Sequence, residues 1–171
     1  MTWFTAEAGK IKTVAKGARQ PKSRFAGTLD LFFDCEIQFV RSRKSELHML
    51  RDATLVQPHS GIRLDFDRVG LAAYFTELLE LTPEPDHPAP ELYDLLQRGL
   101  THLHEQPASR RALVHFETEL ARLLGIAQSG VPAAVALGRT YTRLPQDRAV
   151  LLKRLPSSTP KQEPRKGAAG A

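Results

Sequence analysis

The hydrophobic pattern of the chain changes its period near residue 60, and this change limits the folds that the chain can adopt. Residues 29–40, LDLFFDCEIQFV, alternate apolar and polar positions, which predicts a half-buried antiparallel strand. Residues 62–81, IRLDFDRVGLAAYFTELLEL, repeat apolar residues at steps of three and four, which predicts a helix buried on most of its surface. A strand-rich part followed by a helical part predicts the α+β class.

The strand-rich part spans residues 1–57. Besides 29–40, residues 10–16 and 46–56 predict two strands, and residues 2–7 predict the end of another. Several short strands with no helix between them are typical of a small barrel.

The helical part spans residues 58–155. Apolar spacing predicts helices over 91–104, 109–124 and 145–155, and the stretch 126–144 stays ambiguous. Ser109 is a suitable N-cap for the helix over 109–124, and Gly125 is a suitable stop. Residues 156–171 contain no large apolar side chain, so we expect a disordered tail.

The most informative charge pattern lies in residues 9–25, GKIKTVAKGARQPKSRF. Six of these residues are basic and none is acidic: Lys10, Lys12, Lys16, Arg19, Lys22 and Arg24. On an extended strand, alternate lysines stand about 6.8 Å apart, which is comparable to the phosphate spacing of an extended nucleic-acid strand. A second basic turn holds Arg41, Arg43 and Lys44. The alternative is that these charges are only exposed to solvent and bind nothing, but a basic run this long without an acidic residue favours phosphate binding.

Aromatic residues near the basic stretch could stack on bases. Phe25 ends the stretch and is the best stacking candidate. Phe33 and Phe39 fall on the apolar face of the strand predicted over 29–40, so we expect them in the core. Phe32 falls on the polar face, where it could stack on a base or pack under the helical part; the second role is favoured.

Several functional classes are disfavoured. Cys35 is the single cysteine and the six histidines are scattered, so we expect no disulfide, metal or other cofactor. No glycine-rich phosphate loop occurs, and no paired carboxylates suit catalysis, so we expect a protein that is not an enzyme. The chain has no long apolar run and no secretory signal pattern, which predicts a cytoplasmic protein without a membrane partner.

Residues 9–27, GKIKTVAKGARQPKSRFAG, resemble the signature of the bacterial DNA repair protein family RecO. There, a strand of the form G-(R/K)-(I/L)-x-x-(V/L)-A-K-G-A-R runs into P-K-S-R-(F/L). Residues 47–100 look like the last barrel strand and first two helices of that family. FETELARLLGI (116–126) is similar to a later helix, so the resemblance covers about residues 1–126.

The resemblance implies an N-terminal OB-fold barrel followed by a helical domain. It also implies a recombination mediator at the bacterial nucleoid that binds single- and double-stranded DNA and anneals strands. Its implied partners are RecR, the tail of single-strand-binding protein, and in many bacteria RecF and RecA. The alternative is an adaptor whose helical domain binds an acidic peptide and whose barrel contacts DNA only weakly.

Three departures from the family pattern qualify these expectations. The chain begins inside what looks like the second barrel strand, so the first strand is expected to be missing, through a fragment or a miscalled start. Many members carry a cysteine cluster where this chain reads IAQSGVPAAVA (126–136), so no zinc is expected. Residues 127–171 match the family poorly.

The helical domain is the expected site for the acidic, apolar-ended tail of single-strand-binding protein. Such a tail needs an apolar pocket rimmed by cations. The candidate residues are Arg110, Arg111, Arg122, Arg139 and Arg143. Arginines that complement helix ends are an equally good interpretation of each one alone.

Overall fold

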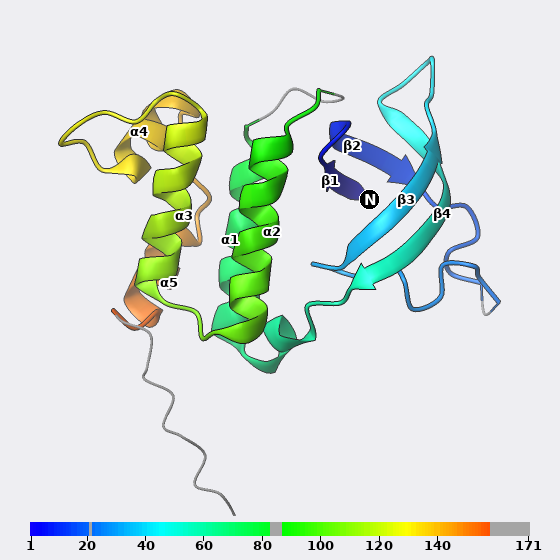
Figure 1. Ribbon diagram of the computed structural model, residues 1–171, viewed down its shortest axis with the longest axis horizontal. Coiled ribbons are helices and arrows are strands. Elements are labelled where there is room, and N and C mark those ends of the chain that lie inside the picture. The colour runs from blue at the N-terminus through cyan, green and yellow to red at the C-terminus, as the bar shows by residue number, and fades with distance from the viewer. Residues whose placement is uncertain (21, 83–86, 158–171) are drawn as a thin grey trace, which may run out of the picture.

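The computed structural model describes residues 1–20, 22–82 and 87–157 and has a sheet beside a group of helices (Figure 1). This confirms the α+β prediction. The described strands are β1 (Thr2–Thr5), β2 (Gly9–Val14), β3 (Asp34–Val40) and β4 (Leu47–Gln57). They lie in the order β1-β2-β4-β3, with β2 parallel to β4 and the other neighbours antiparallel.

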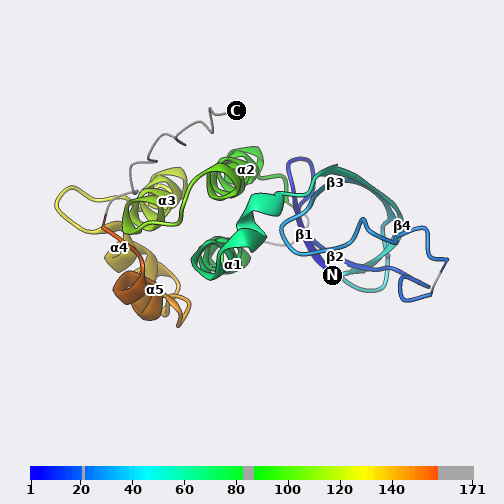
Figure 2. The same cartoon turned by 90° about the horizontal axis from the view of Figure 1, so that it is seen from below.

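The sheet curls strongly but is not closed as a barrel, so the barrel prediction is confirmed only as a curved sheet (Figure 2). Within the described residues, β1 and β3 each pair with one neighbour and form the two edges. Register shifts at Asp34/Cys35 and Gln38/Phe39 interrupt the pairing of β3 with β4. Shifts of this kind bend a strand and increase its twist, which explains the curl.

The predicted strand over 29–40 is wrong in its first five residues, because β3 begins at Asp34. Residues 29–33 are irregular, with a turn at 31–32; Phe32 has a positive φ of 63°, and Leu31 is 70% exposed. An alternating pattern gives two faces only where the backbone is extended. Beyond that limit, Phe32 swings toward the helices and packs against their core, the favoured one of its two predicted roles.

The helical part begins with the 3-10 turn η1 (Ser60–Leu64), followed by α1 (Phe66–Glu80) and α2 (Pro90–Glu105). It continues with α3 (Arg110–Leu123), α4 (Ala133–Thr140) and α5 (Arg148–Arg154). As predicted, Ser109 caps α3, its hydroxyl accepting the Ala112 N–H at 3.2 Å, and Gly125 follows the helix with a φ of 70°. The ambiguous stretch contains α4, and the tail predicted over 156–171 lies outside the described residues from 158 onward.

One continuous apolar core joins the helices. At its centre the rings of Phe75 and Phe116 stack with centroids 3.9 Å apart. Gly99 of α2 allows this approach, because a Cβ there would lie 3.1 Å from the Phe75 ring and 3.2 Å from Phe116. Phe66, which the helical pattern places inside, is instead 71% exposed. It is the first residue of α1, and the Arg154 guanidinium lies 4.6 Å from its ring centroid.

A tight joint connects the sheet to the helices just after β4. The Gly61 N–H donates to Nδ1 of His104 at 2.9 Å, which brings η1 against the end of α2. The Arg68 guanidinium donates to the carbonyls of Gly61, Leu103 and His104 at 3.1–3.3 Å. One cation therefore satisfies carbonyl groups at the α2 C-terminus, where positive charge is favoured.

Candidate nucleic-acid interface

The loop between β2 and β3 carries four of the predicted DNA-binding cations. Its first half is a series of turns, closed by backbone hydrogen bonds from Ala18 to Ala15, Gln20 to Gly17, Ser23 to Gln20 and Ala26 to Ser23. The four turns hold one cation each: Lys16, Arg19, Lys22 and Arg24, all exposed. The four exposed cations therefore follow one another on successive turns of a single loop.

The predicted row of lysines along β2 does not form. The strand ends at Val14, so Lys16 belongs to the loop. The Lys10 amine points to the helices and donates to the Glu80 carbonyl at 2.7 Å, the last residue of α1. Lys12 lies 3.7 Å from the Glu46 carboxylate, and both side chains are more than half exposed. An exposed pair of this kind is weak, so Lys12 can exchange its partner for a phosphate.

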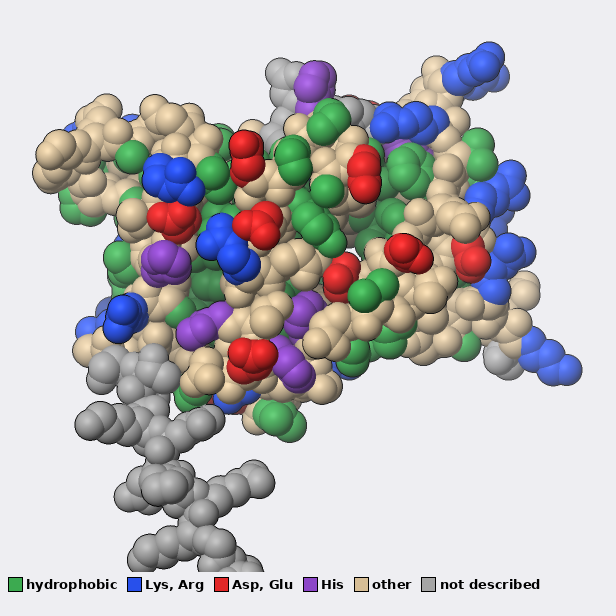
Figure 3. Space-filling view, in the orientation of Figure 1, with side chains coloured by type: hydrophobic (Ala, Val, Ile, Leu, Met, Phe, Trp, Pro, Cys, Tyr) green, Lys and Arg blue, Asp and Glu red, His purple; other side chains and the backbone are tan. Residues whose placement is uncertain are grey.

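The second basic turn joins β3 to β4. Arg41, Arg43 and Lys44 are exposed there, and the Ser42 hydroxyl shapes the turn by accepting the N–H groups of Lys44 and Ser45 at 3.2 Å. The Arg41 guanidinium lies 5.8 Å from the Phe39 ring centroid. Lys and Arg side chains gather over this turn and over the loop after β2, along the end of the sheet farthest from the helices (Figure 3).

Phe25 is placed differently from the exposed stacking ring that the sequence predicts. It is 4% exposed and packs with Leu50 and Ala53 in the small core of the sheet. The Arg24 guanidinium lies 5.9 Å from its ring centroid, and Arg24 also donates to the Arg51 carbonyl at 3.1 Å. The basic loop is therefore anchored on the sheet by a buried aromatic side chain.

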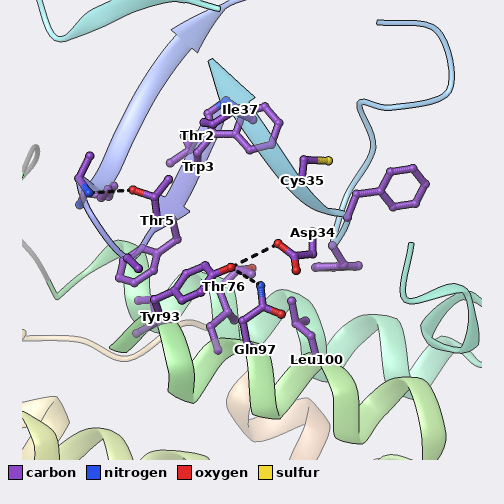
Figure 4. A pocket seen from close by; sticks show the side chains of 18 of the residues that line it. Thr2, Trp3, Thr5, Asp34, Cys35, Ile37, Thr76, Tyr93, Gln97 and Leu100 are labelled. Atoms are coloured by element: carbon purple, nitrogen blue, oxygen red, sulfur yellow. Dashed lines mark hydrogen bonds between the residues drawn. The ribbon is translucent and has the colours of Figure 1, made fainter. Parts of the chain in front are cut away.

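A cleft of about 980 Å³ separates the open side of the sheet from α1 and α2 (Figure 4). Within it, the Tyr93 hydroxyl donates to Asp34 at 3.3 Å and accepts from the Gln97 amide at 3.0 Å. Burial, together with the Asp34 charge, raises the pKa of Tyr93. Among the described residues, the charged side chains lining the cleft are four carboxylates and two cations: Glu7, Asp34, Glu36, Glu80, Lys10 and Arg41. This excess of negative charge disfavours phosphate, so the cleft is a poor candidate for DNA.

The five arginines predicted to bind a partner do not converge. Arg110 and Arg111 begin α3 while Arg122 lies at its end, about 18 Å away along the axis. Arg122 is held by Glu119 at 3.0 Å. Arg139 is exposed at the end of α4.

Arg143 borders a separate hollow of about 190 Å³, shared with Glu77, Glu80 and Leu81. At most a subset of the five could therefore rim one pocket.

A buried polar group that the sequence did not reveal links three helices. Glu117 of α3 is 1% exposed and accepts from the Tyr74 hydroxyl of α1 and, through both its oxygens, from Arg148 of α5 at 2.6 and 2.9 Å. Burial raises the pKa of Tyr74, and the hydrogen bonds to Glu117 raise that of Arg148. The partners lie 31 and 43 positions from Glu117, so local spacing carries no signal for this group.

Two further observations concern the described residues. No helix among them combines the length and hydrophobicity that crossing a membrane requires. In the same part of the chain, His, Cys, Asp and Glu side chains do not gather in threes around a possible metal site.

Comparison with known proteins gives matches to two family models. Residues 1–59 match Recombination protein O N terminal, and residues 63–129 match Recombination protein O C terminal. The boundary between the two matches falls at η1, where the sheet meets the helices.

Curated relatives named DNA repair protein RecO agree. That of Pelobacter propionicus is 37% identical over 150 residues, covering 87% of this chain and 58% of the relative. That of Syntrophus aciditrophicus is 31% identical over 127 residues, covering 74% and 49%, and that of Syntrophotalea carbinolica is 34% identical with the same coverage. The chain thus spans about half the length of the curated relatives it matches. With both family models matched in order on either side of the joint, the chain belongs to the RecO family of DNA repair proteins.

Proposed function

We propose that this chain acts in DNA repair as a mediator of recombination that binds single-stranded DNA at the basic end of its sheet and anneals complementary strands. The observation that carries the proposal is the cluster of exposed cations on the successive turns after β2, beside the basic turn between β3 and β4. Annealing needs no catalytic group. A cationic surface lowers the repulsion between two polyanions and raises their local concentration.

The interface comprises Lys12, Lys16, Arg19, Lys22, Arg24, Arg41, Arg43 and Lys44. Lys10 joins it only where DNA competes with the Glu80 carbonyl for its amine. Arginine can bind two phosphate oxygens at once, whereas lysine contributes a point charge. A loop with both suits a phosphate backbone whose spacing varies, as that of a single strand does.

The same proposal assigns protein partners to the helices. RecR, with RecF where it is present, would act with the DNA-bound chain to help RecA replace single-strand-binding protein. The acidic tail of that protein would dock on the α3–α4 side, near Arg122 and Arg139. Because α1 and α2 lie between α3 and the sheet, DNA and tail would not compete for one surface (Figure 1).

A salt titration tests the DNA part. If about five cations contact phosphates of a single strand, the logarithm of the binding constant should fall against the logarithm of salt concentration with a slope of about −3.5. The combined change Lys16→Ala, Arg19→Ala and Lys22→Ala should weaken binding to all sequences alike and reduce the slope to about −1.4. A wild-type slope near zero would reject the proposal and favour an adaptor that contacts DNA weakly.

A further inference from the structure

The basic loop wraps an apolar hollow. The hollow has a volume of about 650 Å³, within the range of small-molecule sites. Its apolar lining comes from Met1, from the loop and from the adjacent strands β2 and β4, and it includes Ala15, Ala18, Phe25, Leu29, Val14 and Leu47. Val14 and Leu47 are 38% and 48% exposed, so both offer apolar surface at the hollow. This surface is therefore open to an apolar ligand.

A cation lines the hollow, and the other cations of the loop lie near it in the chain. Arg19 lines the hollow. In the chain, Lys16 lies on the turn before that of Arg19, and Arg24 lies on a later turn of the same loop. None of the described residues that line it is acidic, in contrast with the cleft beside α1 and α2. The hollow therefore suits a ligand that has a flat apolar group on an anionic backbone.

We propose that this hollow receives an unpaired nucleobase of the strand whose phosphates lie on the surrounding cations. The inference rests on the proposed DNA binding and extends it, because it assigns the base a place of its own. A base in a duplex is stacked and paired and cannot enter, whereas a base of a single strand is free to do so. Phe25 is 4% exposed, so it supports the wall of the hollow from the core and is not an exposed stacking ring.

The test compares two strands that have equal numbers of phosphates: an oligothymidylate and an abasic strand of the same length. Placing one base on an apolar surface typically changes affinity by about 5- to 150-fold, so wild type should bind the oligothymidylate at least fivefold more tightly. The salt slopes of the two strands should agree, because the phosphate contacts are the same.

Filling the hollow should remove this preference. Ala26 lines it and is exposed, so Ala26→Leu places a side chain there without disturbing the core. The variant should bind both strands with the affinity that wild type shows for the abasic strand. Ala18→Leu fills the hollow from a second position, and Ala127→Leu, at an exposed position after α3, is the matched control that keeps the preference.

The outcomes separate the two proposals. Equal binding of both strands by wild type, or a preference that survives in both folded filling variants, overturns the base site and leaves phosphate binding in place. Failure of wild type to bind either strand overturns the proposed DNA binding itself. Circular dichroism confirms the folding of each variant before its affinity is compared.

Discussion

Replacing Glu117 by Gln tests whether the buried polar group between α1, α3 and α5 stabilises the helices. The substitution keeps the size of the side chain but removes the charge that Arg148 binds at 2.6 and 2.9 Å. Breaking a buried ion pair costs about 3–5 kcal/mol. The Arg148 side chain is 25% exposed and stays partly hydrated, and Gln still accepts from Tyr74, so we expect about 2–3 kcal/mol.

Urea unfolding followed by circular dichroism reports on this part of the molecule, because the signal is dominated by the helices. Trp3 lies in β1, so its fluorescence reports separately on the sheet. For a chain of this size the expected loss lowers the melting temperature by about 4–12 °C. The matched control is Glu119→Gln on the same helix, whose Arg122 partner is 60% exposed; it should cost less than about 1 kcal/mol.

A loss for Glu117→Gln no larger than that of the control would refute the reasoning. The combined change Glu117→Leu, Arg148→Met and Tyr74→Phe gives a second check, because it removes the ion pair together with the hydroxyl that donates to it. Replacing a whole buried polar group by apolar side chains of similar volume is often neutral or stabilising. The triple variant should therefore be more stable than Glu117→Gln, and a triple variant that is less stable would show that the charges do more than satisfy one another.

The remaining predictions concern the joint, the buried histidine and metal content. Gly61→Ala should destabilise the fold by more than about 2 kcal/mol, as overpacking of a core does, because the new Cβ would lie 2.0 Å from the His104 carbonyl oxygen. Urea unfolding measures this loss, and an unchanged midpoint would contradict the prediction. Burial lowers the pKa of His59, so as the pH falls the unfolded chain binds the proton at a higher pH than the folded chain does. The contribution of neutral His59 to the free energy of unfolding is complete above about pH 6.5 and is lost as the pH falls through the folded-state pKa. His59→Asn, which tolerates the φ of 42°, should reduce the drop in urea midpoint between about pH 7.5 and 5.5, whereas His115→Asn at an exposed site should leave it unchanged. Elemental analysis of the purified chain should find no stoichiometric zinc, and one tightly held metal ion per chain would contradict the expectation from its single cysteine.

The sequence predicted structural features well where interactions between residues close together in the chain determine them. The cap at Ser109 and the stop at Gly125 depend on residues within one turn, and both appear as predicted. The pattern over 29–40 failed at Leu31 because alternation cannot say where an extended backbone ends. Packing between residues far apart in the chain determines where the strand begins, and here Phe32 packs against the core of the helices.

In the candidate interface, too, features set by nearby residues could be predicted and features set by distant contacts could not. The exposed charges on the loop after β2 could be predicted, because a turn-rich basic segment has few ways to bury its cations. The role of Lys10 could not, because its partner, the carbonyl of Glu80, lies 70 positions away. Likewise, the sequence does not distinguish Arg148 from the other arginines near the C-terminal end, because its ion pair with Glu117 joins residues distant in the chain.

The cleft between the sheet and α1 and α2 has a consequence for how the molecule behaves at high concentration. Residues of both edge strands, β1 and β3, line this cleft, so the helices stand in front of the unpaired backbone groups (Figure 2). Exposed sheet edges are templates for aggregation, and covering them with a helix is one natural protection. We therefore expect the contacts across the cleft, Tyr93 with Asp34 and Lys10 with Glu80, to limit aggregation by keeping the helices against these edges. Loosening them would favour aggregation even while each part of the molecule stays folded.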